Sequence, residues 1–140
     1  MSDMGQVSGV AIVQTPHGPM RYEIVSGPKY LRADLYNRRT AEDTRKFLST
    51  LAAECTRLDC FNILVSVHAS KPIFTLERYG FSSFIQIALR NSAKIAALTD
   101  NAECRVAHEY AVMLARLRGV NVRTFRDEAV AVAWLENGQK

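Results

Sequence analysis

Two short runs, FNILVSV at residues 61–67 and AKIAAL at 93–98, are apolar on both of the faces that a strand would present. A strand with one face in water alternates apolar and polar residues, so these runs indicate strands that are covered on both sides. Residues 75–89 lie between the two runs and have helical spacing, as does a second stretch at 107–117. Strands that alternate with helices predict an α/β fold with a mostly parallel sheet.

The N-terminal part has a different pattern. Residues 20–25 (MRYEIV) and 29–37 (KYLRADLYN) are predicted strands, and the second alternates apolar and polar residues with period two. Together they predict an antiparallel hairpin, while residues 1–19 are either an N-terminal tail or an extra edge strand. Residues 20–140 then form one domain: a mixed sheet of about five strands, mostly parallel, with four helices. Thr40 and Asp43 have the spacing of a capping box for the first helix.

Composition narrows the class of protein. The chain has 140 residues, 48% of them hydrophobic, and a net charge of +4 that is spread along the sequence. A diffuse basic excess does not favour nucleic acid as a partner. Three cysteines without a C-x-x-C pair indicate a reducing compartment, and Cys55 is predicted to be a small buried hydrophobe. With no 18-residue apolar run and no signal peptide, we expect a cytoplasmic protein without a transmembrane segment.

Three stretches, taken in order, resemble a known family. They are RRTAEDTRKFL (38–48), AKIAALTD (93–100) and VRTFRDEAVAVAWL (122–135). Over about residues 20–137 the chain resembles the SpoIIAA-like, STAS-type family (sulfate transporter and anti-sigma factor antagonist). The resemblance implies a STAS-like fold and a non-enzymatic regulatory module that binds a protein partner. In the anti-sigma factor antagonists, phosphorylation of a serine after a central strand abolishes this binding.

The corresponding position in this chain is the loop His68–Ala69–Ser70–Lys71. The family's aspartate, second hydroxyl and glycine are absent there, so His68, Ser70 and Lys71 form only a candidate regulatory loop. The second interpretation is an ordinary polar loop in which Ser70 satisfies backbone groups. An enzyme is the lowest-ranked interpretation, and it would need an acid such as Glu77, Asp100 or Glu103 beside His68. We predict no catalytic residue.

The other polar candidates are isolated. His17, His68 and His108 lie on three different elements without metal-ligand spacing, so we predict no metal site and no cofactor. His108 is expected to be a surface residue. Arg38 and Arg39, before the first helix, either contact an anion or are solvated.

The segment from residue 73 to 89 carries more apolar side chains than one helical stripe needs. Such a helix must bury a second face. Packing within the domain is one interpretation, a protein partner or homodimer is the second, and a small lipophilic ligand in a pocket under the segment is the third. We take partner contact as the leading functional hypothesis and the ligand as its alternative. The candidate surface residues are Phe74, Leu76, Tyr79, Phe81, Phe84 and Ile87.

Overall fold

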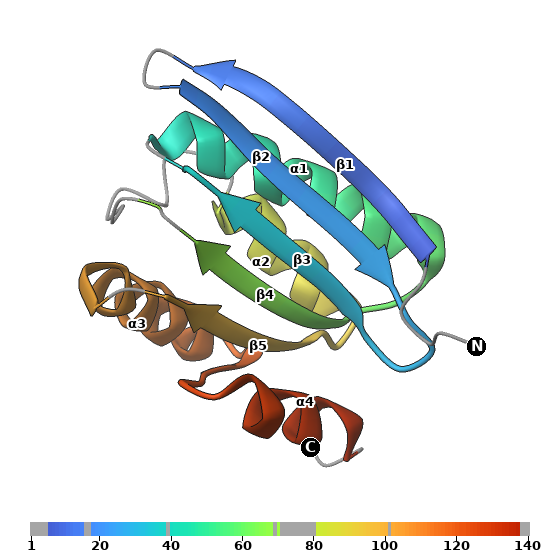
Figure 1. Ribbon diagram of the computed structural model, residues 1–140. Helices are drawn as coiled ribbons and strands as arrows, with labels where there is room; N and C mark the ends of the chain where they lie inside the picture. The colour runs from blue at the N-terminus through green and yellow to red at the C-terminus, as the bar shows by residue number, and fades with distance from the viewer. Residues whose placement is uncertain are drawn as a thin grey trace.

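A computed structural model describes residues 6–15, 18–38, 40–68, 70, 81–100 and 102–137. These residues form one mixed sheet of six strands, with spatial order β1-β2-β3-β4-β5-β6, and four helices (Figure 1). The elements are β1 (Gln6–Thr15), β2 (Gly18–Ser26), β3 (Leu31–Tyr36), α1 (Ala41–Leu58), β4 (Asn62–His68), α2 (Phe81–Arg90), β5 (Lys94–Thr99), α3 (Ala102–Leu117), β6 (Asn121–Thr124) and α4 (Glu128–Glu136).

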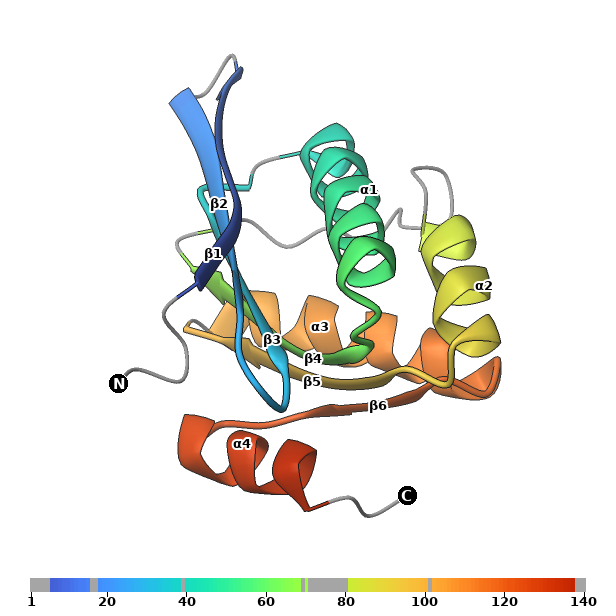
Figure 2. The same ribbon diagram turned by 90° about the vertical axis from the view of Figure 1, so that its right-hand side faces the viewer.

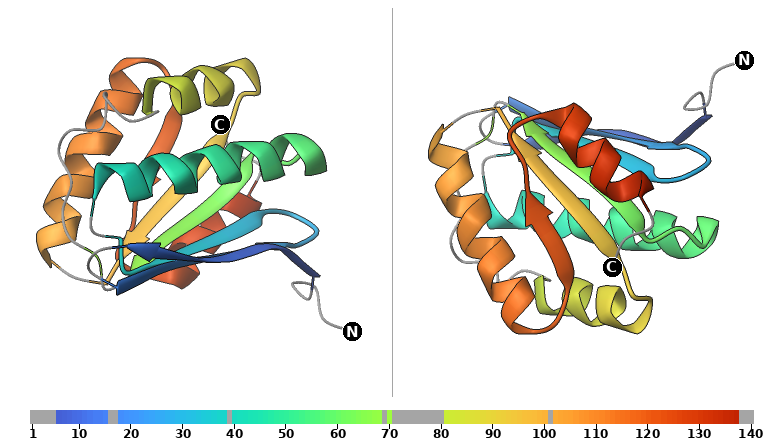
Figure 3. Two further views of the ribbon diagram at one scale, coloured as in Figure 1. Left: turned by 90° about the horizontal axis from the view of Figure 1, so that it is seen from above. Right: turned by 90° about the horizontal axis from the view of Figure 1, so that it is seen from below.

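The helices are divided unequally between the two faces of the sheet. Strand β2 is antiparallel to β1 and to β3, whereas β3, β4, β5 and β6 are parallel to one another in consecutive order. Right-handed crossovers that advance in one direction place all their helices on one face. Accordingly α1, α2 and α3 lie on one face, and α4 alone packs on the other, over β4 and β5 (Figures 2 and 3).

The helix ends follow local chemistry. The Thr40 side chain accepts a hydrogen bond from the Asp43 N–H, and the Asp43 carboxylate accepts one from the Thr40 N–H, which confirms the predicted capping box. After α3, Gly119 has φ +100°, a conformation that side chains rarely adopt and that closes the helix. Cys55 is fully buried on α1, as predicted, and burial raises the pKa of its thiol to about 12.

The α/β class, the mixed sheet and the four helices are confirmed. The sheet has six strands because residues 6–15 form β1, an edge strand paired with β2, which is one of the two interpretations of residues 1–19. Strand β2 begins at Gly18, so the expected boundary between residues 19 and 20 falls inside it. The expected helix at 75–89 is described only from Phe81, and residues 71–80 lie outside the described part of the chain.

Two separate clusters of apolar side chains form the core. The larger one joins the sheet to α1, α2 and α3, and the smaller one lies under α4. At its C-terminal end α4 is tied to the sheet by side chains: Asn62 donates to the Leu135 carbonyl (3.1 Å) and Lys94 to the Trp134 carbonyl (2.6 Å). None of the described helices is both long and apolar enough to cross a membrane.

Candidate functional site

Ser70 holds three segments of the chain together. Its hydroxyl donates to the His68 carbonyl (2.9 Å) and accepts from the Arg38 N–H (3.0 Å), while the Cys104 thiol donates to the Ser70 carbonyl (2.9 Å). Ser70 is only 7% exposed. This hydroxyl satisfies main-chain groups and does not bond to the His68 imidazole, so the geometry is that of the ordinary polar loop. Lys71, the third residue of the candidate regulatory loop, lies outside the described residues.

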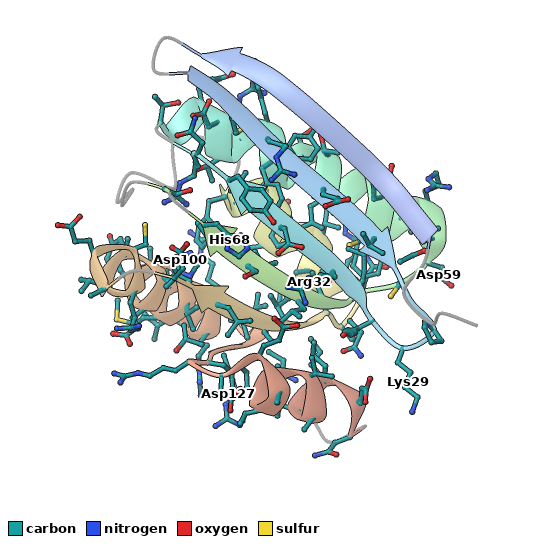
Figure 4. All side chains as sticks on the ribbon, viewed as in Figure 1. Lys29, Arg32, Asp59, His68, Asp100 and Asp127 are labelled. Atoms are coloured by element: carbon teal, nitrogen blue, oxygen red, sulfur yellow. The ribbon has the colours of Figure 1, made fainter. Side chains whose placement is uncertain are left out.

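The His68 imidazole lies between two carboxylates at the carboxyl ends of the parallel strands. Its Nε2 is 3.0 Å from Asp34 Oδ1, and its Nδ1 is 3.8 Å from Asp100 Oδ2. Figure 4 shows His68 and Asp100 close together, with Arg32 nearer the start of β3. The His68 ring stacks on the Tyr36 ring, with 4.6 Å between the ring centroids. The Arg21 guanidinium carbon lies over the Tyr36 ring, 3.9 Å from its centroid.

Arg32 links one of the acids beside His68 to the start of α4. Arg32 donates from Nε to Asp34 (2.9 Å) and from Nη2 to Glu128 at the start of α4 (3.2 Å). The hydrogen bond to Glu128, and to a lesser extent Asp34, raises the pKa of Arg32 against the opposing effect of burial. We call Arg32, Asp34, Tyr36, His68 and Asp100 the His68 cluster. Its acids pair with its bases, and it faces solvent: the Asp100 side chain is 49% exposed.

A cavity of about 140 Å³ lies on the other face of the sheet, under α1, α2 and α3. We call it the α2 cavity. Four residues of α2 contribute to its wall: Phe81, Phe84, Ile85 and Ala88. The other described lining residues are Leu35, Arg38, Thr44, Phe47, Leu48, Leu51, Val65, Val67, Ile95, Ala97, Ala107, His108, Ala111, Val112, Ala115, Val120 and Val122. All but three of these lining side chains are apolar.

Three lining residues are polar: Arg38 before α1, Thr44 in the first turn of α1, and His108 near the middle of α3. Arg38 is only 6% exposed, so the interpretation that its side chain is solvated is wrong. Burial lowers the pKa of Arg38, partly offset by Cys104 and Asp43. His108 is half-buried and not a surface residue as expected. Burial, and then the Arg38 charge, lower its pKa to about 4, so its imidazole is neutral at pH 7.

The predicted apolar surface is divided by the structure. Phe81 faces the α2 cavity, Phe84 borders both this cavity and an outer groove between α1 and α2, and Ile87 borders only the groove. The groove has a volume of about 690 Å³. Phe74, Leu76 and Tyr79 lie outside the described residues.

Sequence reasoning missed Asp34, although it lies on the polar side of an alternating strand. The residue becomes a partner of His68 only through the parallel register, in which Asp34 is opposite Ser66 and Tyr36 is opposite His68. Among the described residues, no group of three or more His, Cys, Asp or Glu side chains is placed to hold a metal ion.

Comparisons of the chain with protein-family models, with curated proteins and with solved structures give no match.

Proposed function

We propose that this chain is a non-enzymatic binding module that holds a small lipophilic molecule in the α2 cavity. The observation that carries the proposal is the cavity itself, lined mostly by apolar side chains from three helices and the sheet. An apolar guest would remove apolar wall area from water, which is favourable by about 25 cal/mol per Å².

The volume limits the size of the guest. An apolar cavity of about 150 Å³ holds benzene, whereas pockets for drug-sized ligands measure about 300–1,000 Å³. We therefore expect a ligand with about six to eight non-hydrogen atoms in its apolar part.

We also propose that the chain is a STAS-type module. The three matching stretches of sequence support this assignment, and the consecutive parallel order of β3 to β6 is compatible with it. The family's members bind a partner and do not turn over a substrate. An enzyme that uses the loop at His68 and Ser70 ranks lower, even though Asp34 and Asp100 flank His68, because the Ser70 hydroxyl bonds to main-chain atoms.

Contact with a protein partner or a second copy is the second candidate function. The outer groove favours it, because Phe84 and Ile87 line this groove together with apolar residues of α1. Light scattering would measure the mass of the particle. If the groove is an interface between copies, Ile87→Glu converts a dimer to a monomer, since a buried unpaired charge is costly.

The ligand proposal is tested on the full chain by NMR titration with benzene and benzyl alcohol. We expect saturable chemical-shift changes at residues around the α2 cavity. Ala111→Leu, which adds carbon atoms inside the cavity, should weaken binding at least about tenfold, equivalent to about 1.4 kcal/mol. Ala53→Leu is the matched control, because Ala53 is exposed and lines only the outer groove.

Two results would overturn the proposal. One is the absence of saturable shifts with either probe, which would make the cavity a packing defect. The other is equal weakening by Ala111→Leu and Ala53→Leu, or weakening by Ala53→Leu alone, which would move the binding site to the groove.

A further inference from the structure

The outer side of α3 carries apolar side chains that the domain leaves exposed. Val106, Met113 and Leu117 are 60%, 48% and 77% exposed, whereas Cys104 and Ala115, on the opposite side of the helix, are buried. Helix α3 packs on β5 and β6 at the margin of the sheet, so its outer side points away from the molecule (Figure 3). Contiguous exposed apolar residues mark interaction sites.

These residues have the spacing of a seam between two paired helices. Together with the half-buried Tyr110, they follow one another at i, i+4, i+7 and i+11, and we call the four residues the α3 seam. Alternating steps of four and three residues are those at which one helix inserts side chains between those of another. We propose that the α3 seam pairs with the α3 seam of a second copy of this chain, antiparallel and about a two-fold axis.

The two-fold axis then passes between Tyr110 and Met113. Val106 lies opposite Leu117 of the second copy, and Tyr110 lies opposite Met113 of the second copy. Each apolar side chain of the seam therefore meets an apolar or aromatic partner.

Two charged residues on one flank of the seam favour the antiparallel orientation. Glu109 and Arg116 are exposed, and each precedes a seam residue by one position. Within the described part of the chain, neither takes part in an ion pair. In an antiparallel pair this flank faces the same flank of the second copy, so Glu109 lies beside Arg116 of the second copy, and symmetry repeats the contact. In a parallel pair Glu109 would instead face Leu114, which offers no charge.

The size of the seam limits the strength of the dimer. Four side chains from each copy form a small interface, of the class below about 1,200 Å² that is weak and transient. We therefore expect a dissociation constant on the order of 1–100 µM. Exposed ion pairs contribute little free energy, so Glu109 and Arg116 select the orientation while the apolar side chains supply most of the affinity.

The α3 seam is separate from the two sites described above. The described lining residues of the outer groove come from α1 and α2. Helix α3 contributes to the α2 cavity through other residues, such as Ala107 and Ala111, and none of the seam residues lines that cavity. The inference therefore goes beyond the proposed function, and either can fail without the other.

Sedimentation equilibrium of the full chain, from about 1 µM to about 1 mM, tests the inference. We expect the mass to rise from that of a monomer to that of a dimer. Met113→Glu places a charge at the centre of the seam and should weaken the dimer at least about 100-fold. Val130→Glu is the matched control, because Val130 is 52% exposed but lies on α4, and it should leave the dimer unchanged.

Charge reversal tests the orientation. Glu109→Arg makes both flanking residues positive, and Arg116→Glu makes both negative, so each variant alone should dimerise about tenfold more weakly. An equimolar mixture of these two variants should associate as tightly as the unmodified chain, because every contact across the axis is again between opposite charges. The double variant Glu109→Arg/Arg116→Glu should also recover the dimer.

Each contrary outcome overturns a stated part of the inference. A monomer at every concentration overturns the dimer and leaves the proposed function standing. A dimer that Met113→Glu leaves intact, or that Val130→Glu weakens equally, overturns the seam; if Ile87→Glu then separates the copies, the outer groove is the interface. Failure of the two charge variants to recover on mixing overturns the antiparallel arrangement. The unmodified chain and the mixture decide these cases even if Met113→Glu does not fold.

Discussion

The two faces of the sheet hold the two half-buried histidines of the described chain in opposite surroundings. His68 has a carboxylate near each ring nitrogen, an aromatic ring against one side and solvent beyond. His108 lines an apolar cavity with a guanidinium as its charged neighbour. In the His68 cluster the acids and bases contact one another and Glu128, whereas the α2 cavity has a mostly apolar wall. The two faces of one sheet therefore place the same side chain, an imidazole, in a charged and in an apolar environment.

The largest expected effect concerns the cavity side. Phe47 is 2% exposed, packs edge-on against Tyr22 at 5.9 Å and lines the α2 cavity. Phe47→Ala should lower the free energy of unfolding by about 3–5 kcal/mol, because it removes buried apolar contacts and enlarges the cavity. Chemical denaturation measures this value. A loss below about 1 kcal/mol would show that this side is not a packed core.

The second prediction uses the pKa of His108, which folding lowers from about 6.5 to about 4. Above pH 6.5 the imidazole is neutral in both states. As the pH falls below 6.5, the unfolded chain takes up a proton that the folded chain refuses until about pH 4, so stability falls in this range. The loss should be about 2–3 kcal/mol by pH 4.

The variant His108→Gln isolates this contribution, because it leaves the neighbouring charges Arg38, Arg105, Glu109 and Arg126 in place. Denaturation of both proteins from pH 7 to pH 4 should show a steeper decline in the unmodified chain. If the stability of both proteins declined equally between pH 7 and pH 4, His108 would lie in a solvated environment. That result would contradict the proposed contrast between the surroundings of His108 and His68.

The smallest effect is expected on the open face. Asp34→Asn removes the charge that Arg32 and His68 share, and should cost about 1–2 kcal/mol, since both partners are partly exposed. Benzene and benzyl alcohol should bind this variant as they bind the unmodified chain. Glu42→Gln, in an exposed pair on α1, is the control and should cause no measurable change. An altered affinity for either probe in Asp34→Asn would show that the two faces are coupled.

Local pattern was sufficient for most of the fold. Two-sided apolar runs predicted β4 and β5, and the Thr40–Asp43 spacing predicted the start of α1. Gly119, the second residue after α3, takes the positive φ that ends the helix. These features depend on residues close in sequence, so a single sequence contains them. The extent of β1 could not be predicted, because a strand at the edge of a sheet is defined by its partner as much as by its own residues.

The sites depended on contacts between distant parts of the chain. The sequence by itself determined that a histidine and a serine end a buried strand, that an arginine pair precedes a helix, and that residues 73–89 are too apolar for one stripe. Only the tertiary structure decided that Ser70 binds main-chain groups, that Asp34 meets His68, and that Arg38 is buried beside His108. The reason is physical: burial and electrostatic surroundings arise from how helices and strands pack, and residue type and spacing do not specify them.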